Sequence, residues 1–351
     1  MTAFLNIVVV LLVAISLWQL SKVLKIYKAS KNDTLQANDE DNKTQGNLML
    51  GFLIFLFVFV VYGLFKWGHL VLSHPASEHG VMVDNLMNIS WVVIFAVFFL
   101  TQFLLHYFAF KYQGKEGQKA LYFSDSNKLE LIWTIIPVIT LAGLILYGLY
   151  GWNQIMSFDF EGEEEPLVVE LYAQQFSWTA RYGGADNTLG DANVRLINAD
   201  KVNVLGLDTS DPNYADDVIV KEIHLPVGRK VWFKMRSQDV LHSAYMPHFR
   251  AQMNCVPGMV TEFAFTPTIT TEEMREMPHI INKVANINEL RAKRRAAGEE
   301  LDDYTFDYLL ICNKICGKSH YNMQLKIVVD TPEEYEAWMK QQKTAKEVIL
   351  K

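Results

Sequence analysis

Cysteine is scarce in this sequence. Only Cys255, Cys312 and Cys316 occur in 351 residues, which excludes a framework of several disulfide bonds. The pattern Cys-x-x-Cys-His is also absent, so no c-type haem domain is fused to the chain. The net charge of −7 argues against nucleic acid as a partner. An acidic outer face would instead suit a basic protein.

Positive charge is missing from one loop between long apolar runs. Residues 69–90 contain no Lys or Arg, whereas the stretches 21–47 and 111–130 contain five and four lysines. By the positive-inside rule, the lysine-rich stretches face the cytoplasm, and the N-terminus and everything after Tyr150 lie outside. Spanning a bilayer takes about 20 apolar residues. The predicted spans within the membrane region 1–150 are 4–20, 48–65, 91–110 and 131–150.

The first apolar run does not resemble a signal peptide. It has no basic segment before it and no small-residue cleavage site after it. We therefore expect it to be a retained helix.

Short strand patterns begin at Pro166. Alternating, β-branched and aromatic-rich segments separated by turn residues predict an all-β Greek-key sandwich or barrel over 166–345. The composition of the insertion 267–305 favours helix. Thr331 before Pro332 predicts the start of a terminal helix. The predicted strands are 167–173, 176–182, 218–225, 230–237, 261–266, 307–312 and 325–330.

The segment CNKICGKSHYNM carries the chemistry. Cys312, Cys316, His320 and Met323 are the thiolate, imidazole and thioether ligands that copper-like metals prefer. A zinc ion bound by four N/S ligands would leave the methionine unused. A second imidazole is needed to complete such a site, and His242 in DVLHS is the candidate. The alternative is a disulfide, or two buried thiols beside a core histidine; Cys255 is expected to be a small buried residue.

This spacing resembles the CuA loop of cytochrome c oxidase subunit II, whose pattern is Cys-x-Glu-x-Cys-x-x-x-His-x-x-Met. The resemblance implies that Cys312 and Cys316 bridge two copper ions, that His242 and His320 each bind one copper, and that Met323 is a weak axial ligand. It also implies a bacterial protein with a cupredoxin fold, in which the metal loop joins the last two strands.

Position 314 departs from the family pattern. The family has glutamate between the cysteines, and here Lys314 stands in its place. Its backbone carbonyl remains available as the opposing weak copper ligand. The glutamate side chain of the family also reaches a magnesium ion, a contact that lysine does not offer. His248 competes with His242 as a copper ligand but has no match in the motif, so we expect a surface or supporting role, and a structural role for His224.

A second family signature, Glu-x-x-Trp-Thr-x-x-Pro, is met by Glu130, Trp133, Thr134 and Pro137. The resemblance implies that Glu130 lies at the mouth of a proton path into the catalytic subunit. The alternative is that this carboxylate only favours the helix dipole at the start of the fourth span.

The family also has a surface tryptophan over the coppers that admits electrons. Here the stretch AQQFSWTARYGG places Phe176 at that position, with Trp178 two residues later. Either ring is a candidate for accepting electrons from the donor. The competing interpretation is that both are ordinary strand residues.

The resemblance therefore implies the electron-transfer subunit of a terminal oxidase in the bacterial inner membrane. Its periplasmic domain would accept electrons from a separate c-type cytochrome and pass them to haem in subunit I. Oxygen is reduced to water there, with proton pumping. The two extra spans and the insertion suggest a supercomplex with a quinol-oxidising assembly. Alternative classes are a quinol oxidase subunit, a nitrous oxide reductase and a copper chaperone.

Overall fold

The computed structural model describes residues 2–30, 38–162, 164–198, 200 and 202–349. The chain forms two compact units. The first unit consists of Met1–Gly68 and Val93–Leu129, and the second of His69–Val92 and Glu130–Lys351.

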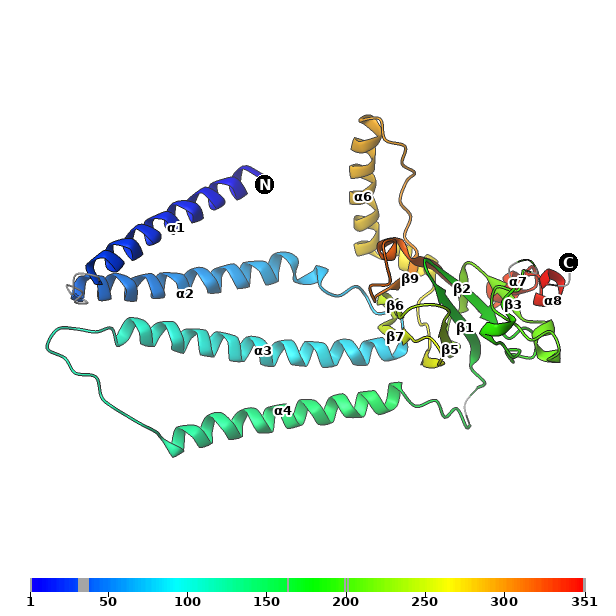
Figure 1. Ribbon diagram of the computed structural model, residues 1–351, viewed down its shortest axis with the longest axis horizontal. Coiled ribbons are helices and arrows are strands. Elements are labelled where there is room, and N and C mark those ends of the chain that lie inside the picture. The colour runs from blue at the N-terminus through cyan, green and yellow to red at the C-terminus, as the bar shows by residue number, and fades with distance from the viewer. Residues whose placement is uncertain (1, 31–37, 163, 199, 201, 350–351) are drawn as a thin grey trace. The chain divides into compact units, whose positions relative to one another are not determined.

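Within the described residues, four helices are long and apolar enough to cross a membrane: α1 (Thr2–Ser30), α2 (Asp39–Trp67), α3 (Glu78–Lys111) and α4 (Asn127–Ile155). Each contains one of the four predicted spans (Figure 1). Almost none of their apolar side chains is buried within the chain. Such surfaces suit lipid or the helices of neighbouring subunits.

In the first unit, the start of α2 meets the turn that follows α3. The side chain of Asn38 caps α2 by accepting a hydrogen bond from the backbone N–H of Asp41. The side-chain amide of Asn42 donates to the carbonyl of Gly114 at 3.1 Å, and the N–H of Glu116 donates to the Asp39 carboxylate at 2.7 Å. Both lysine-rich stretches therefore meet at one end of this unit, as the charge pattern requires.

The β domain of the second unit contains two five-stranded sheets. The strand order of the first sheet is β3-β2-β1-β5-β8, and that of the second is β4-β10-β9-β6-β7. The β1–β5 and β10–β4 pairs are parallel, and the other paired strands are antiparallel. The strands are β1 (Leu167–Gln174), β2 (Ser177–Tyr182), β3 (Val218–Val220), β4 (Ile223–Pro226), β5 (Val231–Ser237), β6 (His242–Met246), β7 (Ala251–Cys255), β8 (Thr261–Phe265), β9 (Tyr308–Cys312) and β10 (Gln324–Asp330).

The predicted fold class is confirmed: transmembrane helices precede a cupredoxin-like β domain that carries a helical insertion. One strand prediction is wrong, because 218–225 is not a single strand. It divides into β3 and β4, which belong to different sheets. The hairpin of β6 and β7 was not predicted, since each strand has only five residues and Pro247 lies between them.

Strand β1 is buried on both faces. One face contributes Leu171 to the core shared by the two sheets, and the other contributes Tyr172 to a smaller cluster with Leu207 and Ile349. The chain between β2 and β3, together with α8 (Ala345–Ile349), covers this outer face.

A buried charge network joins the same covering segment to the sheet. Arg181 on β2 donates to Glu170 on β1 at 2.7 Å and to Asp217 at 2.8 Å, and Arg236 also donates to Glu170. Although burial alone would raise it, the charges of Arg181 and Arg236 and their hydrogen bonds hold the pKa of Glu170 below its usual value. Pairing of this kind is required because an unpaired charge in the interior is costly.

The insertion forms α5 (Thr271–Glu276) and α6 (Pro278–Ala296). Met274 and Ile280 are buried in the core of the β domain and anchor the base of the insertion. The rest of α6 projects from the domain, and the returning chain runs beside it (Figure 1). The Asn288 side chain bonds both the N–H and the carbonyl of Tyr304, at 2.6 and 3.1 Å.

The terminal helix begins where predicted. Thr331 and Glu334 form a reciprocal capping box at the start of α7 (Pro332–Met339). His224 on β4 stacks on Trp338 of α7 with ring centroids 4.2 Å apart, and its Nδ1 lies 2.6 Å from the Asp330 carboxylate. These contacts fit the structural role predicted for His224.

Candidate metal centre

The two cysteines of the metal motif lie in one closed loop. Cys312 ends β9 and Met323 immediately precedes β10, and the Cys312 N–H donates to the Met323 carbonyl at 3.0 Å. Both thiols are buried, and their Sγ atoms are 3.9 Å apart. A disulfide bond is about 2.05 Å long, so the sulfurs are not bonded to each other and both cysteines are free.

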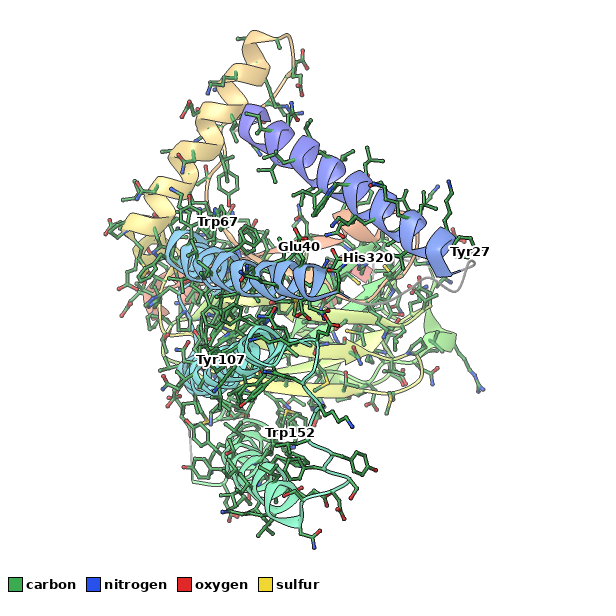
Figure 2. All side chains as sticks on the ribbon, turned by 90° about the vertical axis from the view of Figure 1, so that its left-hand side faces the viewer. Tyr27, Glu40, Trp67, Tyr107, Trp152 and His320 are labelled. Atoms are coloured by element: carbon green, nitrogen blue, oxygen red, sulfur yellow. The ribbon has the colours of Figure 1, made fainter. Side chains whose placement is uncertain are left out.

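The other donor atoms converge on these sulfurs. His242 Nδ1 lies 3.8 Å from Cys312 Sγ. His320 Nδ1 lies 3.6 Å from Cys316 Sγ. His320 is labelled in Figure 2. Met323 Sδ lies 3.8 Å from the same sulfur. The structure therefore brings the five predicted side-chain ligands together.

The Lys314 backbone also faces the site. Its carbonyl oxygen is 3.2 Å from Cys312 Sγ, while its side chain is exposed. The carbonyl is thus placed as the predicted sixth donor, and the ammonium group is left in solvent.

These separations fit metal coordination. Metal–sulfur bonds of about 2.3 Å and metal–nitrogen bonds of about 2.0–2.1 Å put adjacent tetrahedral donors about 3.5–3.8 Å apart. The side-chain donor pairs lie at 3.6–3.9 Å. The ligand atoms of His242, Cys312 and Cys316 all lie within 4.8 Å of one another. The residues present therefore fit a metal ion without rearrangement of the loop.

The Cys316 thiol must lose its proton to bind a metal ion. Desolvation, reinforced by the neighbouring Cys312, raises the pKa of Cys316 to about 11. This thiol is consequently protonated at neutral pH unless a metal ion displaces its proton. Soft sulfur donors with imidazoles are the donor set that copper and zinc select.

Asp239 fixes the orientation of His242, a role that was not predicted from the sequence. Its Oδ1 lies 2.9 Å from His242 Nε2, so the opposite ring nitrogen faces the thiols. Its carboxylate also accepts hydrogen bonds from the backbone N–H groups of Gln175 and Val240, both at 2.7 Å. Burial tends to raise the pKa of Asp239, but the hydrogen bonds from His242 and these two N–H groups hold it below its usual value. The sequence signal that could have identified Asp239 is its position three residues before His242.

The two candidate rings for electron uptake occupy different environments. Phe176 is half-buried and touches the metal loop: a Cβ added to Gly317 would lie 2.7 Å from its ring. Trp178 is fully buried, with its ring edge-on to His242 at 6.1 Å and its Nε1 donating to the Met323 carbonyl at 3.4 Å. Phe176 thus reaches the outside of the loop and Trp178 supports it from within.

Gln175 is a second supporting residue that was not predicted. Its side-chain amide donates to the Cys316 carbonyl at 2.5 Å. No sequence signal identifies Gln175 as a contact of the metal loop, because 141 residues separate it from Cys316.

The remaining candidates lie outside the donor group. Cys255 pairs with His242 across β6 and β7 and is fully buried; burial raises the pKa of its thiol to about 12. His248 contacts Phe306 and Tyr308 edge-on instead of the sulfurs. Glu130 is exposed in the first turn of α4.

Fold and site together define a class: a membrane-anchored cupredoxin-like protein with a buried Cys/His group that could hold a metal ion. The family model "Cytochrome C oxidase subunit II, transmembrane domain" matches residues 66–150. The alternative cytochrome c oxidase subunit 2 of Bradyrhizobium diazoefficiens is 32% identical over 272 residues, covering 77% of this chain and 83% of that protein. Cytochrome c oxidase subunit 2 of Thermostichus vulcanus is 23% identical, covering 78% and 79%. The chain belongs to the cytochrome c oxidase subunit 2 family.

A solved structure was also matched, the periplasmic domain of subunit II (CoxB) of Bradyrhizobium japonicum. It has a TM-score of 0.31 and 17% identity, and the match covers 53% of this chain and 97% of that one. Family membership makes this protein a subunit of a haem–copper terminal oxidase that works with other oxidase subunits in a membrane.

Proposed function

We propose that this chain is the electron-accepting subunit of the oxidase, with a dinuclear copper centre held by His242, Cys312, Cys316, His320 and Met323. The Lys314 carbonyl would be the sixth donor. The observation that carries the proposal is the convergence of two free thiols, two imidazole nitrogens and a thioether at 3.6–3.9 Å. When bound, such a centre would supply one-electron transfer between an external donor and haem in subunit I.

The protein groups would hold the donors still while charge changes. Asp239 fixes one imidazole, Gln175 fixes the Cys316 carbonyl, and Trp178 fixes the Met323 carbonyl. Because the ligands are rigid and buried, they move little when the metal changes its charge, and the reorganisation energy of electron transfer is low. The chain itself would make and break no covalent bonds.

The donor would be a separate c-type cytochrome that approaches from the periplasm, since the chain has no haem attachment motif. Phe176 would lie on the path because it touches the metal loop at Gly317. The chain would sit in the bacterial inner membrane with its β domain in the periplasm, and the supercomplex with a quinol-oxidising assembly belongs to the same proposal.

Glu130 would serve as the mouth of a proton path into subunit I, where oxygen reduction drives pumping. Its exposed carboxylate in the first turn of α4 supports this role. The Glu130→Gln variant should lower oxygen turnover and leave the copper absorption spectrum unchanged. Wild-type turnover in this variant would leave the helix dipole as the only role of the carboxylate.

Metal analysis tests the copper proposal. The purified oxidase should contain two copper ions in this subunit, with the spin-resonance signal of a mixed-valence pair. Cys312→Ser and Cys316→Ser should abolish that signal. The Cys255→Ala variant is the matched control, because that thiol is equally buried but lies outside the donor group. A single copper per subunit would favour the chaperone alternative, and a metal-free subunit with full turnover would contradict the proposal.

A further inference from the structure

Four loops meet at the end of the β domain that holds the candidate copper donors. They connect β1 to β2, β5 to β6, β7 to β8 and β9 to β10, and their residues are 175–176, 238–241, 256–260 and 313–323. The Gln175 side chain donates to the Cys316 carbonyl, and the Gln175 N–H donates to the Asp239 carboxylate. Pro257 forms a β-bridge with Ser237, directly before the second of these loops. The four loops therefore form one surface, which we call the metal-end surface.

Large apolar side chains on the metal-end surface face solvent. Ile315 is 86% exposed and Tyr321 is 88% exposed, the highest values among the large apolar side chains that the structure describes after α4. Met259 and Val260, on the β7–β8 loop, are 54% and 50% exposed. Groups of exposed apolar side chains mark contact sites for other proteins. Ile315 and Tyr321 are each the sequence neighbour of a candidate copper donor, so a protein that covers them comes to lie against the metal loop.

The free charge on the same surface is positive. Lys314 and Lys318 lie on either side of Cys316 in the sequence, and both are exposed. Within the four loops, every residue of which is described, Asp239 is the only acidic residue. Its carboxylate already accepts three hydrogen bonds from within the protein. The whole chain has a net charge of −7, so the metal-end surface has the opposite sign to the chain average.

The turn between β3 and β4, which contacts β2 beside this surface, adds no net charge. It carries Lys221 and Glu222. The Lys221 ammonium donates to the Trp178 carbonyl at 3.3 Å, and the Glu222 carboxylate pairs with Lys326 at 3.4 Å. The positive charge that faces a partner is therefore that of the metal loop itself.

We propose that the electron donor docks on the metal-end surface through a face that combines an apolar centre with surrounding carboxylates. This inference rests on the proposed electron-accepting function and gives the chemistry of its partner. Ile315 and Tyr321 pack against the apolar edge of the donor's redox group. Lys314 and Lys318 attract the carboxylates around that edge. Complementary charge accelerates and orients the encounter, whereas apolar contact holds the complex together. A donor with a basic face, which the net charge of the chain favours, is repelled here.

One c-type cytochrome in two forms serves as the probe: the native protein with a basic, lysine-rich face, and the same protein after succinylation, which replaces each modified ammonium by a carboxylate. Ferric probes transfer no electron, so biolayer interferometry with the complete oxidase gives their dissociation constants. Ferrous probes, each giving up one electron to the copper centre, give the rate constant of reduction by stopped flow. At about 0.1 M ionic strength the succinylated form should bind at least about fivefold more tightly and react faster. About 1 M salt should remove most of the difference, because the Debye length falls to about 3 Å.

Two variants separate charge from apolar contact. Lys318→Glu should weaken binding of the succinylated form severalfold and strengthen binding of the native form. Tyr321→Ala should weaken binding of both forms severalfold at every salt concentration, because it removes apolar contact and no charge. Lys343→Glu is the matched control and should change neither. Lys343 is also exposed, but it precedes Thr344, which bridges to Val218 beside the end of β2 farthest from the metal loop.

The copper spectrum is recorded for each variant and should stay unchanged. Tighter binding of the native form, or no effect of Lys318→Glu, would overturn the acidic donor face. No effect of Tyr321→Ala would overturn the apolar contact, and no effect of either variant would mean that another subunit or a second copy covers this surface. Binding in the expected order without reduction of the copper would contradict the electron-accepting function and still support the docking chemistry.

Discussion

Gly317 is required by the backbone of the metal loop. Its φ is +142°, a conformation that side-chain-bearing residues rarely adopt. A Cβ at this position would also lie 2.7 Å from the Phe176 ring and 3.1 Å from the Gln175 side-chain amide. Backbone and packing thus both exclude a larger residue.

The Gly317→Ala variant should lower the free energy of unfolding of the β domain by about 2–4 kcal/mol, from backbone strain plus overlap with Phe176. Thermal unfolding with copper content as a second readout measures this. Gly258→Ala is the matched control, because Gly258 has a φ of +83° but open space around its Cβ position. Equal losses in the two variants would show that the Phe176 contact contributes nothing.

Asp239 acts on the metal site through His242. Replacing it with asparagine removes the negative charge that holds the imidazole by its Nε2. Supporting residues of this kind typically change metal affinity about 10–100-fold. The Asp239→Asn variant should therefore retain less copper after dialysis against a chelator, measured as copper per subunit. Asp208→Asn, a partly exposed carboxylate that accepts hydrogen bonds from the backbone N–H and the hydroxyl of Ser210, should retain the wild-type amount.

At the scale of elements, the insertion has a fixed base and a projecting tip. The base is anchored by Met274 and Ile280 in the core, whereas the basic side chains of the tip pair with the insertion's own acids, as in Arg294–Glu299. Exposed pairs of this kind contribute little to stability. The tip is therefore free to serve contact with another protein.

Replacing residues 289–303 by a short loop removes the tip and keeps its base, because Asn288 and Tyr304 are already hydrogen-bonded neighbours. If the tip helps to dock the electron donor or a neighbouring complex, electron uptake should slow severalfold while the copper spectrum stays unchanged. Stopped-flow reduction by the donor cytochrome measures this. Unchanged uptake would leave the tip as a solvated appendage.

At the scale of the whole second unit, Arg250 connects α3 to the β domain. Its Nε and Nη2 donate to the two oxygens of Asp84 on α3 at 2.7 and 2.8 Å. The same guanidinium donates to the carbonyls of Ser73 and Pro247 at 2.5 and 2.7 Å. A planar guanidinium group has enough N–H donors, in fixed directions, to bond all these acceptors at once, and a lysine ammonium does not. Lysine is therefore not an equivalent residue at this position.

Breaking the Arg250–Asp84 pair should cost about 2–3 kcal/mol, below the value for a fully buried pair, because one largely desolvated charge then lacks its partner. Arg250→Gln and Asp84→Asn should each lower the thermal midpoint of the β-domain unit, and the double variant should cost less than the sum of the two. Additive losses would contradict the pairing. The copper spectrum should be retained, since neither residue contacts the metal loop.

The sequence alone determined the features that depend on neighbouring residues. Cys312, Cys316, His320 and Met323 lie within one loop, so their spacing by itself predicted a shared site. The four apolar runs predicted helices because bilayer thickness sets the length of a span, and Thr331 marked a helix start through contacts within one turn.

Only the tertiary structure decided what depends on distant segments. Sheet pairing divided 218–225 between two sheets, and packing brought Gln175 to the Cys316 carbonyl and His74 to His279. The physical reason is that local patterns encode periodicity and capping, whereas strand register and side-chain contacts across 100 or more residues follow from the packing of the whole core.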